Sequence, residues 1–181
     1  ISWDLYTSTG TENHAKVTHD VFTKLFEKGH IDRRSSEQFY DEDAGRFLPD
    51  RYIEGVCPHC EYSEARGDQC ENCGRTLDPE ELINPVSKIS GSEPTLRETE
   101  HFYLRLSDFQ EPLSEWLSGR EGWRNHVLNF SKGWIEEGLH DRAITRDLDW
   151  GVEVPIDGIG EDKKIYVWFE AVIGYLSASK E

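Results

Sequence analysis

The sequence predicts a mixed α/β chain with a metal-binding segment in its middle. Four cysteines form two Cys-x-x-Cys pairs, which is a typical metal-ligand spacing. Stretches with apolar residues at helical spacing lie on both sides of these pairs, and a fully apolar run near the end is typical of a buried strand. The 181 residues are enough for one domain, or for one domain and part of a second.

The two cysteine pairs contain all the cysteines of the chain, and nine residues separate them. Two residues between the cysteines of a pair let both thiolates reach one ion, and a second pair completes a tetrahedron. Gly67 and Gly74 flank the second pair, and glycine permits the tight turns that such knuckles need. Four thiolates leave no position for a substrate, so the metal is expected to hold the fold. We predict one structural Zn²⁺, bound by Cys57, Cys60, Cys70 and Cys73.

The competing interpretation of these cysteines is a pair of disulfides. Disulfide-rich domains are short, dense in cysteine and secreted. This chain has four cysteines in 181 residues, no apolar N-terminal segment like a signal peptide, and no run long enough to span a bilayer. The sequence therefore favours zinc and a cytoplasmic protein without a membrane partner. His59, inside the first pair, is expected in solvent because four sulfurs already fill a zinc shell.

Acidic residues dominate the surface chemistry, with 36 Asp and Glu against 20 Lys and Arg and a net charge of −16. This charge is expected to repel RNA and anionic membranes. The acidic residues are spread along the chain, and aromatic residues are too frequent for a disordered protein. A dispersed acidic surface indicates a halophile, because screening at high salt shortens electrostatic repulsion to a few ångströms. An ordinary acidic cytosolic surface is the alternative.

The first half of the chain is expected to contain one helix and several strands. Residues 1–9 alternate apolar and polar side chains as a strand does. A capping box at residues 9–12 predicts the start of a helix, and Gly29 predicts its end. Short strands and turns are expected over residues 36–56, and two strands over residues 88–106.

The second half is expected to alternate helices and strands. One helix is predicted from about residue 107 and another over residues 122–137, each with a stripe of apolar residues. Residues 150–155 and 165–169 are predicted as strands, and residues 170–179 as a helix. Four aromatic residues of the two helical stripes are expected in the core: Trp116, Trp123, Phe130 and Trp134.

Six segments of the chain follow one another in an order that is specific for one family. They are FLPDRY at 47–52, the cysteine segment ending in GDQCENCG at 57–74, DPEELINP at 78–85, RETEHF at 97–102, ITRD with WG at 144–151, and YVWFEAVIGY at 166–175. Together they cover nearly the whole chain and resemble the methionyl-tRNA synthetases. The cysteine segment resembles the zinc-bearing connective peptide of that family, and the acidic surface is similar to that of haloarchaeal members.

The resemblance implies a middle fragment of a class I aminoacyl-tRNA synthetase. The fold implied is a Rossmann-type catalytic domain interrupted by an α+β connective domain with a zinc knuckle. Residues 1–30 are then expected to belong to the catalytic domain. Residues 31–141 are expected to form the connective domain, with the knuckle at 57–73, and residues 142–181 to return to the catalytic domain.

The resemblance also implies the chemistry of a methionine–tRNA ligase. Methionine attacks the α-phosphate of ATP to give methionyl-adenylate and pyrophosphate, and the acceptor end of tRNA(Met) then takes the methionyl group. ATP and Mg²⁺ bind only in the full-length enzyme. The family's HIGH and KMSKS motifs are absent from this sequence, so the chain alone is expected to be inactive.

Two other functions compete with this interpretation. One is a non-catalytic zinc-ribbon module that binds RNA or protein, although the sequence has no basic patch with interleaved aromatic residues. The other is a synthetase of the same class for leucine, isoleucine or valine, whose insertion is larger than the compact one here.

The site residues follow from the resemblance, position by position. Four residues match the family's methionine pocket: Trp168, Ala171, Val172 and Tyr175. Aromatic rings suit a thioether because sulfur is polarizable, but many members have proline in place of Val172. Arg146 matches an arginine that is important for methionine activation, where it is expected to pair with a carboxylate; a surface Arg–Asp pair is the alternative. His101 and His126 are expected to be structural.

Ser87 and Ser90 stand where some relatives carry another Cys-x-x-Cys pair and bind a second zinc. Hydroxyls do not replace thiolates at zinc. A second zinc ion is therefore not expected in this chain.

Overall fold

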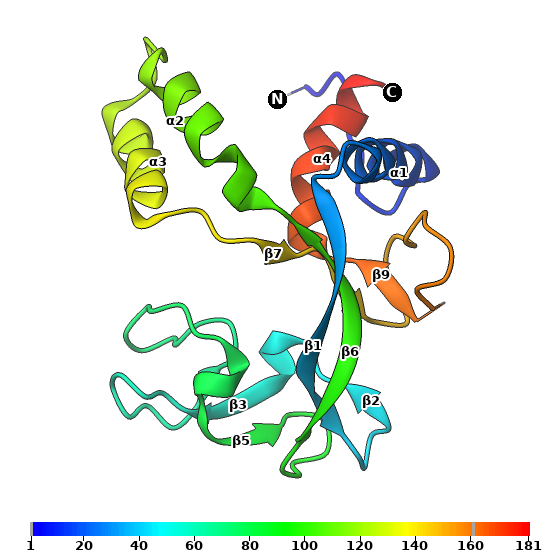
Figure 1. Ribbon diagram of the computed structural model, residues 1–181, viewed down its shortest axis with the longest axis vertical. Helices are drawn as coiled ribbons and strands as arrows, with labels where there is room; N and C mark the ends of the chain where they lie inside the picture. Colours follow the sequence, from blue (N-terminus) through cyan, green and yellow to red (C-terminus); the bar gives the residue numbers. More distant parts are fainter. Residues whose placement is uncertain (1, 161) are drawn as a thin grey trace.

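The computed structural model describes residues 2–160 and 162–181. A long two-stranded ribbon, β1 with β6, connects helices at one end of the molecule to a small sheet at the other (Figure 1). The α-helices are α1 (Glu12–Glu27), α2 (Gln110–Ser118), α3 (Asn125–Glu137) and α4 (Val167–Ser179), and the 3₁₀ helices are η1 (Asp50–Tyr52), η2 (Pro79–Glu81) and η3 (Leu106–Phe109). None of the helices in the described residues combines the length and the apolar character that crossing a membrane requires.

The ribbon forms the two central strands of a four-stranded antiparallel sheet, ordered β2-β1-β6-β7. Its strands are β1 (Ile31–Asp41), β2 (Arg46–Phe47), β6 (Thr95–Leu104) and β7 (Arg142–Ala143). β1 and β6 pair without a break from Ile31 opposite Leu104 to Tyr40 opposite Thr95. The prediction of short strands from residue 36 is therefore wrong at its start, because residues 31–41 form one continuous strand.

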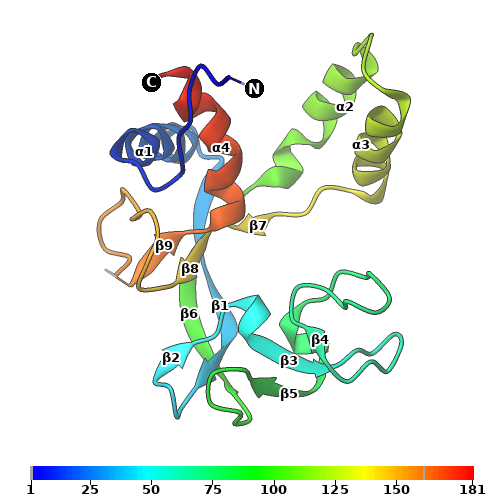
Figure 2. The same cartoon turned by 180° about the vertical axis from the view of Figure 1, so that it is seen from behind.

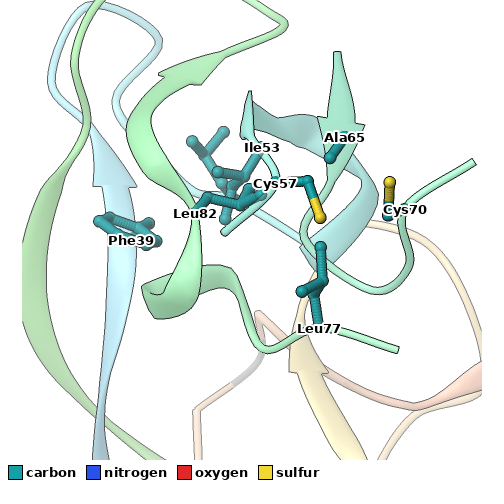
Figure 3. Close-up of a cluster of buried hydrophobic side chains, with 8 residues drawn as sticks. Phe39, Ile53, Cys57, Ala65, Cys70, Leu77 and Leu82 are labelled. Carbon is teal, nitrogen blue, oxygen red and sulfur yellow. The ribbon is translucent and has the colours of Figure 1, made fainter. Parts of the chain in front are cut away.

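A second sheet, ordered β4-β3-β5, carries the cysteine turns. Its strands are β3 (Ile53–Val56), β4 (Ala65–Arg66) and β5 (Ile83–Ser87), and β5 therefore ends at residue 87, just before residue 88, where the first of two strands was predicted to begin. We call residues 53–87 the knuckle module. Its core extends to the ribbon through Phe39 of β1 (Figure 3). The other buried residues of this core are Leu48, Ile53, Cys57, Ala65, Cys70, Leu77 and Leu82.

The other core lies where α1 and α4 meet the opposite end of the ribbon (Figure 2). The rings of Phe22 and Phe102 meet edge to face at a centroid distance of 5.4 Å, and Phe169 contacts Phe22 at 6.1 Å. A two-stranded sheet of β8 (Thr145–Asp147) and β9 (Lys163–Ile165) completes this end of the molecule. The mixed α/β character is confirmed.

The ends of α1 follow from capping chemistry. The N-cap is Thr11 and not the Thr9 of the predicted capping box, and the hydroxyl of Thr11 accepts a hydrogen bond from the backbone N–H of His14 at 3.1 Å. Gly29, at φ +76°, ends the helix as predicted. The strand predicted over residues 1–9 is wrong for residues 2–9, which form no strand, and Ile1 lies outside the described residues.

The predicted burial of the four aromatic residues is wrong, and the second predicted helix begins at Asn125, so Trp123 lies in the connection between α2 and α3. Trp116, Trp123, Phe130 and Trp134 are all exposed, and Phe130 retains 70% of its accessible surface. Helical spacing correctly grouped Phe130 with Trp134 on α3, but α2 and α3 pack on each other and project from the body in both views (Figures 1 and 2). Within the described residues no third layer covers them.

The apolar run near the C-terminus divides between two elements. β9 ends at Ile165 and α4 begins at Val167, so the predicted strand over 165–169 is mostly helix. The helix places Phe169 against Phe22 of α1, which an extended strand would not do. Residues 150–155 form only an isolated bridge, between Glu153 and Lys164.

Candidate metal centre and substrate cleft

Two tight turns bring the four cysteines together. β3 leads directly into Cys57, whose N–H donates to the carbonyl of Tyr62 at 2.8 Å. In the second turn the N–H of Cys70 donates to the carbonyl of Arg75 at 2.9 Å. Gly74 follows with φ +73°, so a left-handed residue is required there, as the sequence predicted.

The sulfur positions match a tetrahedral metal site. All four Sγ atoms lie within 4.8 Å of one another. The Sγ of Cys57 is 3.9 Å from that of Cys73, and the Sγ of Cys60 is 3.6 Å from that of Cys70. A tetrahedron with Zn–S bonds of about 2.3 Å places its sulfurs about 3.8 Å apart, whereas a disulfide requires about 2.05 Å. The four cysteines are free, so the disulfide interpretation is wrong.

Hydrogen bonds favour the thiolate form that a metal requires. The side-chain amide of Asn72 donates to the sulfur of Cys60 at 3.5 Å. This bond, followed by the backbone N–H of Tyr62, lowers the pKa of Cys60 to about 6. Cys57 and Cys70 are fully buried, while His59 is exposed and accepts a hydrogen bond from Arg75 at 3.1 Å. The donor set therefore fits a closed four-thiolate centre without a histidine ligand.

Arg146 lies on β8 with its side chain only 13% exposed. Its guanidinium donates to the carbonyls of Ala143 at 3.0 Å and Thr145 at 2.9 Å, and its Nη2 lies 3.5 Å from a carboxylate oxygen of Asp50. The guanidinium carbon stands 4.0 Å from the ring centre of Tyr166. Arg146 therefore does pair with an aspartate, but this aspartate is Asp50 of η1 and the guanidinium is mostly buried and not at the open surface.

Asp147 belongs instead to a buried polar cluster. Lys163 contacts its carboxylate directly, and Nε2 of His101 lies 3.1 Å from it. Burial lowers the pKa of His101, and the hydrogen bonds from His101 and Lys163 lower the pKa of Asp147 although burial opposes them. The structural role expected for His101 agrees with these contacts, and His126 is exposed on α3.

A cavity of about 190 Å³ lies beside Arg146. Trp168 and Tyr166 line it together with residues of η1, and its other lining side chains include Leu148 and Trp150. The chain thus brings Arg146 and Trp168, which are 22 positions apart, to one largely apolar cleft. This combination can bind a small ligand that has both an apolar part and a carboxylate.

The remaining predicted pocket residues lie on the same face of α4 as Trp168. Trp168 is 71% exposed, Val172 66% and Tyr175 83%, while Ala171 is partly buried. Of these four, only Trp168 lines the cavity. Within the described residues, this face of α4 is therefore largely exposed, and it borders the cavity only at Trp168.

The opposite face of α4 contains a buried contact that sequence reasoning missed. His14 of α1 is fully buried, with Nε2 2.5 Å from a carboxylate oxygen of Glu170 and Nδ1 3.0 Å from the hydroxyl of Ser177. Glu170 also lines the cavity. The positions 170 and 177 are one heptad apart, which is the one pattern that could have indicated a shared polar face.

Comparison with known proteins shows the family of this chain. Residues 1–181 match the family described as tRNA synthetases class I (M). This chain belongs to that family. It is 57% identical over 181 residues to the methionine–tRNA ligase of Dehalococcoides mccartyi, covering 100% of this chain and 32% of the relative. It is 53% identical over 180 residues to that of Thermoplasma volcanium, covering 99% and 33%.

The fold is shared with solved synthetases. Mycobacterium tuberculosis methionyl-tRNA synthetase bound by methionyl-adenylate superposes with a TM-score of 0.62 at 20% identity, covering 98% of this chain and 30% of that structure. The structure of the same enzyme in its free state gives a TM-score of 0.60. The chain therefore spans about a third of the length of the relatives it matches.

Proposed function

We propose that this chain is the part of a methionine–tRNA ligase that links its zinc-bearing connective domain to one wall of its methionine pocket. The observation that carries the proposal is the meeting of Arg146 and Trp168 at one cleft, in a chain that is 57% identical to methionine–tRNA ligases. On this proposal residues 1–30 and 142–181 belong to the catalytic domain and residues 31–141 to the connective domain.

The cleft residues then have separate roles. Trp168, with Ala171, Val172 and Tyr175 on the same helix face, provides apolar and aromatic surface for the methionine side chain. Arg146 offers its guanidinium to the methionine carboxylate, and Asp50 and Tyr166 hold that guanidinium in place. Carboxylate attack on the α-phosphate of ATP displaces pyrophosphate, and the tRNA(Met) acceptor end then takes the methionyl group in the cytoplasm.

The cysteine centre has a supporting role in this proposal. One Zn²⁺ would be held by the four cysteines, Cys57, Cys60, Cys70 and Cys73. It would cross-link the two turns of the knuckle and take no part in the chemistry at the substrate. The zinc module that binds RNA on its own is less well supported, because the chain carries a net charge of −16.

The proposal is tested in the full-length enzyme by pyrophosphate exchange. Trp168→Ala is expected to lower kcat/KM for methionine by about 10- to 100-fold, through loss of apolar burial and of sulfur–aromatic contact. Trp134→Ala is the matched control, because it removes an equally large exposed ring on α3, away from the cleft. Equal effects of the two substitutions, or exchange activity in the isolated 181-residue chain, would contradict the proposal.

A further inference from the structure

The interface between α1 and α4, which lie side by side in both views (Figures 1 and 2), is built around His14. His14 has no exposed surface. Its Nε2 lies 2.5 Å from Oε2 of Glu170, and its Nδ1 lies 3.0 Å from the hydroxyl oxygen of Ser177. Thr18, one turn further along α1, places its hydroxyl 3.3 Å from the same Nε2. Both ring nitrogens of His14 are therefore engaged inside the interface.

The hydrogen bonds of Ser177 determine which nitrogen of His14 carries hydrogen. A serine hydroxyl has one hydrogen, and that of Ser177 is donated to the carbonyl of Gly174 at 2.9 Å. The Ser177 oxygen is therefore the acceptor in its contact with His14, and Nδ1 is the donor. Nε2 and the Glu170 carboxylate must then share a proton, because two acceptors without one would repel each other at 2.5 Å.

Glu170 connects this interface to the cleft. Its side chain is only 10% exposed, and it lines the cavity of about 190 Å³ together with Trp168 and Arg146. His14 has no exposed surface and so cannot touch a ligand in that cavity. Any influence of His14 on the cleft must therefore pass through Glu170 and the helix that carries it.

The first turn of α4 is held against α1 by two neighbouring side chains. Phe169 makes the apolar contact, with its ring 6.1 Å from that of Phe22, and Glu170 makes the polar contact, with His14. Trp168 precedes both of them in the same turn and is itself 71% exposed. The position of Trp168 in the cleft is therefore set by the turn, and His14 provides the polar half of the contact that fixes this turn.

We propose that His14 is a positioning residue of the methionine site, which holds Glu170 against α1 and thereby fixes the turn of α4 that places Trp168 in the cleft with Arg146. This inference rests on the proposed function, because it requires methionine to bind in this cleft. It assigns Glu170 the role of hydrogen-bond partner to His14, and not that of a charged contact to the ligand.

The first test measures the Kd of the full-length enzyme for methionine by equilibrium dialysis without ATP. His14→Ala is expected to raise this Kd about tenfold, because residues that share one contact network are coupled. Asn13→Ala is the matched control. Nδ2 of Asn13 donates to the carbonyl of Ser177 at 2.9 Å, so Asn13 also links α1 to α4, but at the last turn of α4. Asn13→Ala is expected to change the Kd by less than about twofold, even where it lowers the melting temperature as much as His14→Ala does.

Variants of Glu170 separate positioning from direct contact with the ligand. Glu170→Gln keeps the length of the side chain, and its amide N–H can donate to Nε2 of a neutral His14 that has its hydrogen on Nδ1. This variant is expected to keep the Kd for methionine within about threefold of the wild type, whereas Glu170→Ala is expected to raise it about tenfold. Adding His14→Ala to Glu170→Ala is expected to cause no further loss, because His14 acts only through Glu170.

Glu170→Gln retains the buried contact, so it tests the proposal also where His14→Ala is too unstable to assay. A rise of about tenfold or more in the Kd of Glu170→Gln would overturn the proposal, because the charge itself would then matter to the ligand. An unchanged Kd in His14→Ala, an equal rise in Asn13→Ala, or a second full loss in the double variant would also overturn it. The proposed function fails separately, if Trp168→Ala leaves kcat/KM for methionine unchanged.

Discussion

Gly67 faces the carbonyl of Asp50 so closely that no side chain fits between them. A Cβ at position 67 would lie 2.5 Å from that oxygen and 3.1 Å from Cγ of Pro79. Both distances are shorter than ordinary carbon contacts, and the N–H of Gly67 is itself bonded to the carbonyl of Ile53 at 3.2 Å. Gly67→Ala must therefore displace backbone, at a cost of about 1–3 kcal/mol, typical of overpacking.

The matched control is Gly133→Ala. Gly133 lies inside α3, and nothing lies within 4 Å of its added Cβ. Alanine is a better helix former than glycine by about 1 kcal/mol, so this change is expected to stabilise the chain. The two Gly→Ala substitutions thus have opposite signs, separated by roughly 2–4 kcal/mol.

Thermal unfolding of the zinc-loaded chain measures both substitutions, since 1 kcal/mol moves the midpoint by about 2–4 °C at this size. Amide exchange at Cys57 and Cys70 locates the change for Gly67→Ala in the knuckle module. Zinc is expected to remain bound, because the new methyl group points at the carbonyl of residue 50 and not at sulfur. A Gly67→Ala chain that melts at or above the wild-type temperature would show that the close approach relaxes without cost.

Two further predictions concern charged groups. Hydrogen bonds from Ser107, and then the contact with Arg34, lower the pKa of Asp141 to about 2. Its contribution to stability is therefore present above about pH 4, where the carboxyl ionises in the unfolded chain, and is lost as the pH falls toward 2. Urea titrations should show that Asp141→Asn lowers the free energy of unfolding at pH 6 and leaves it unchanged at pH 2. A difference in free energy between variant and wild type that persists at pH 2 would contradict this. Lys163→Met removes the buried cation that compensates the Asp147 carboxylate and should lower the free energy of unfolding by about 3–5 kcal/mol. Adding Asp147→Leu should recover most of that loss. No recovery in the double variant would mean that the loss comes from packing and not from charge.

The cysteine centre was predictable because its ligands are local. Each pair of thiolates is fixed by two intervening residues, so spacing alone determines which atoms can share an ion. The start of α1 was predictable only to within two residues, because Thr11 is the N-cap and not the Thr9 of the predicted capping box. Local patterns could not show that Asp50 faces Arg146 across 96 positions, or that His14 meets Glu170 across 156.

The errors have a common physical origin. The stripe containing Phe130 and Trp134 correctly defines one face of α3, but periodicity contains no information on whether another layer covers that face. The apolar run at residues 165–169 satisfies a buried strand and a buried helix equally well. In the fold, contact of Phe169 with Phe22 decides for the helix.

The paired ribbon has a mechanical consequence. Ten consecutive residue pairs at about 3.4 Å per residue give an arm of about 30 Å between the two ends of the molecule. Bending that arm by about 5° at its base would swing the far tip by roughly 3 Å, about the length of a hydrogen bond. The stiffness of the β1–β6 ribbon therefore limits how accurately a group bound at one end of the molecule can be positioned relative to the other end.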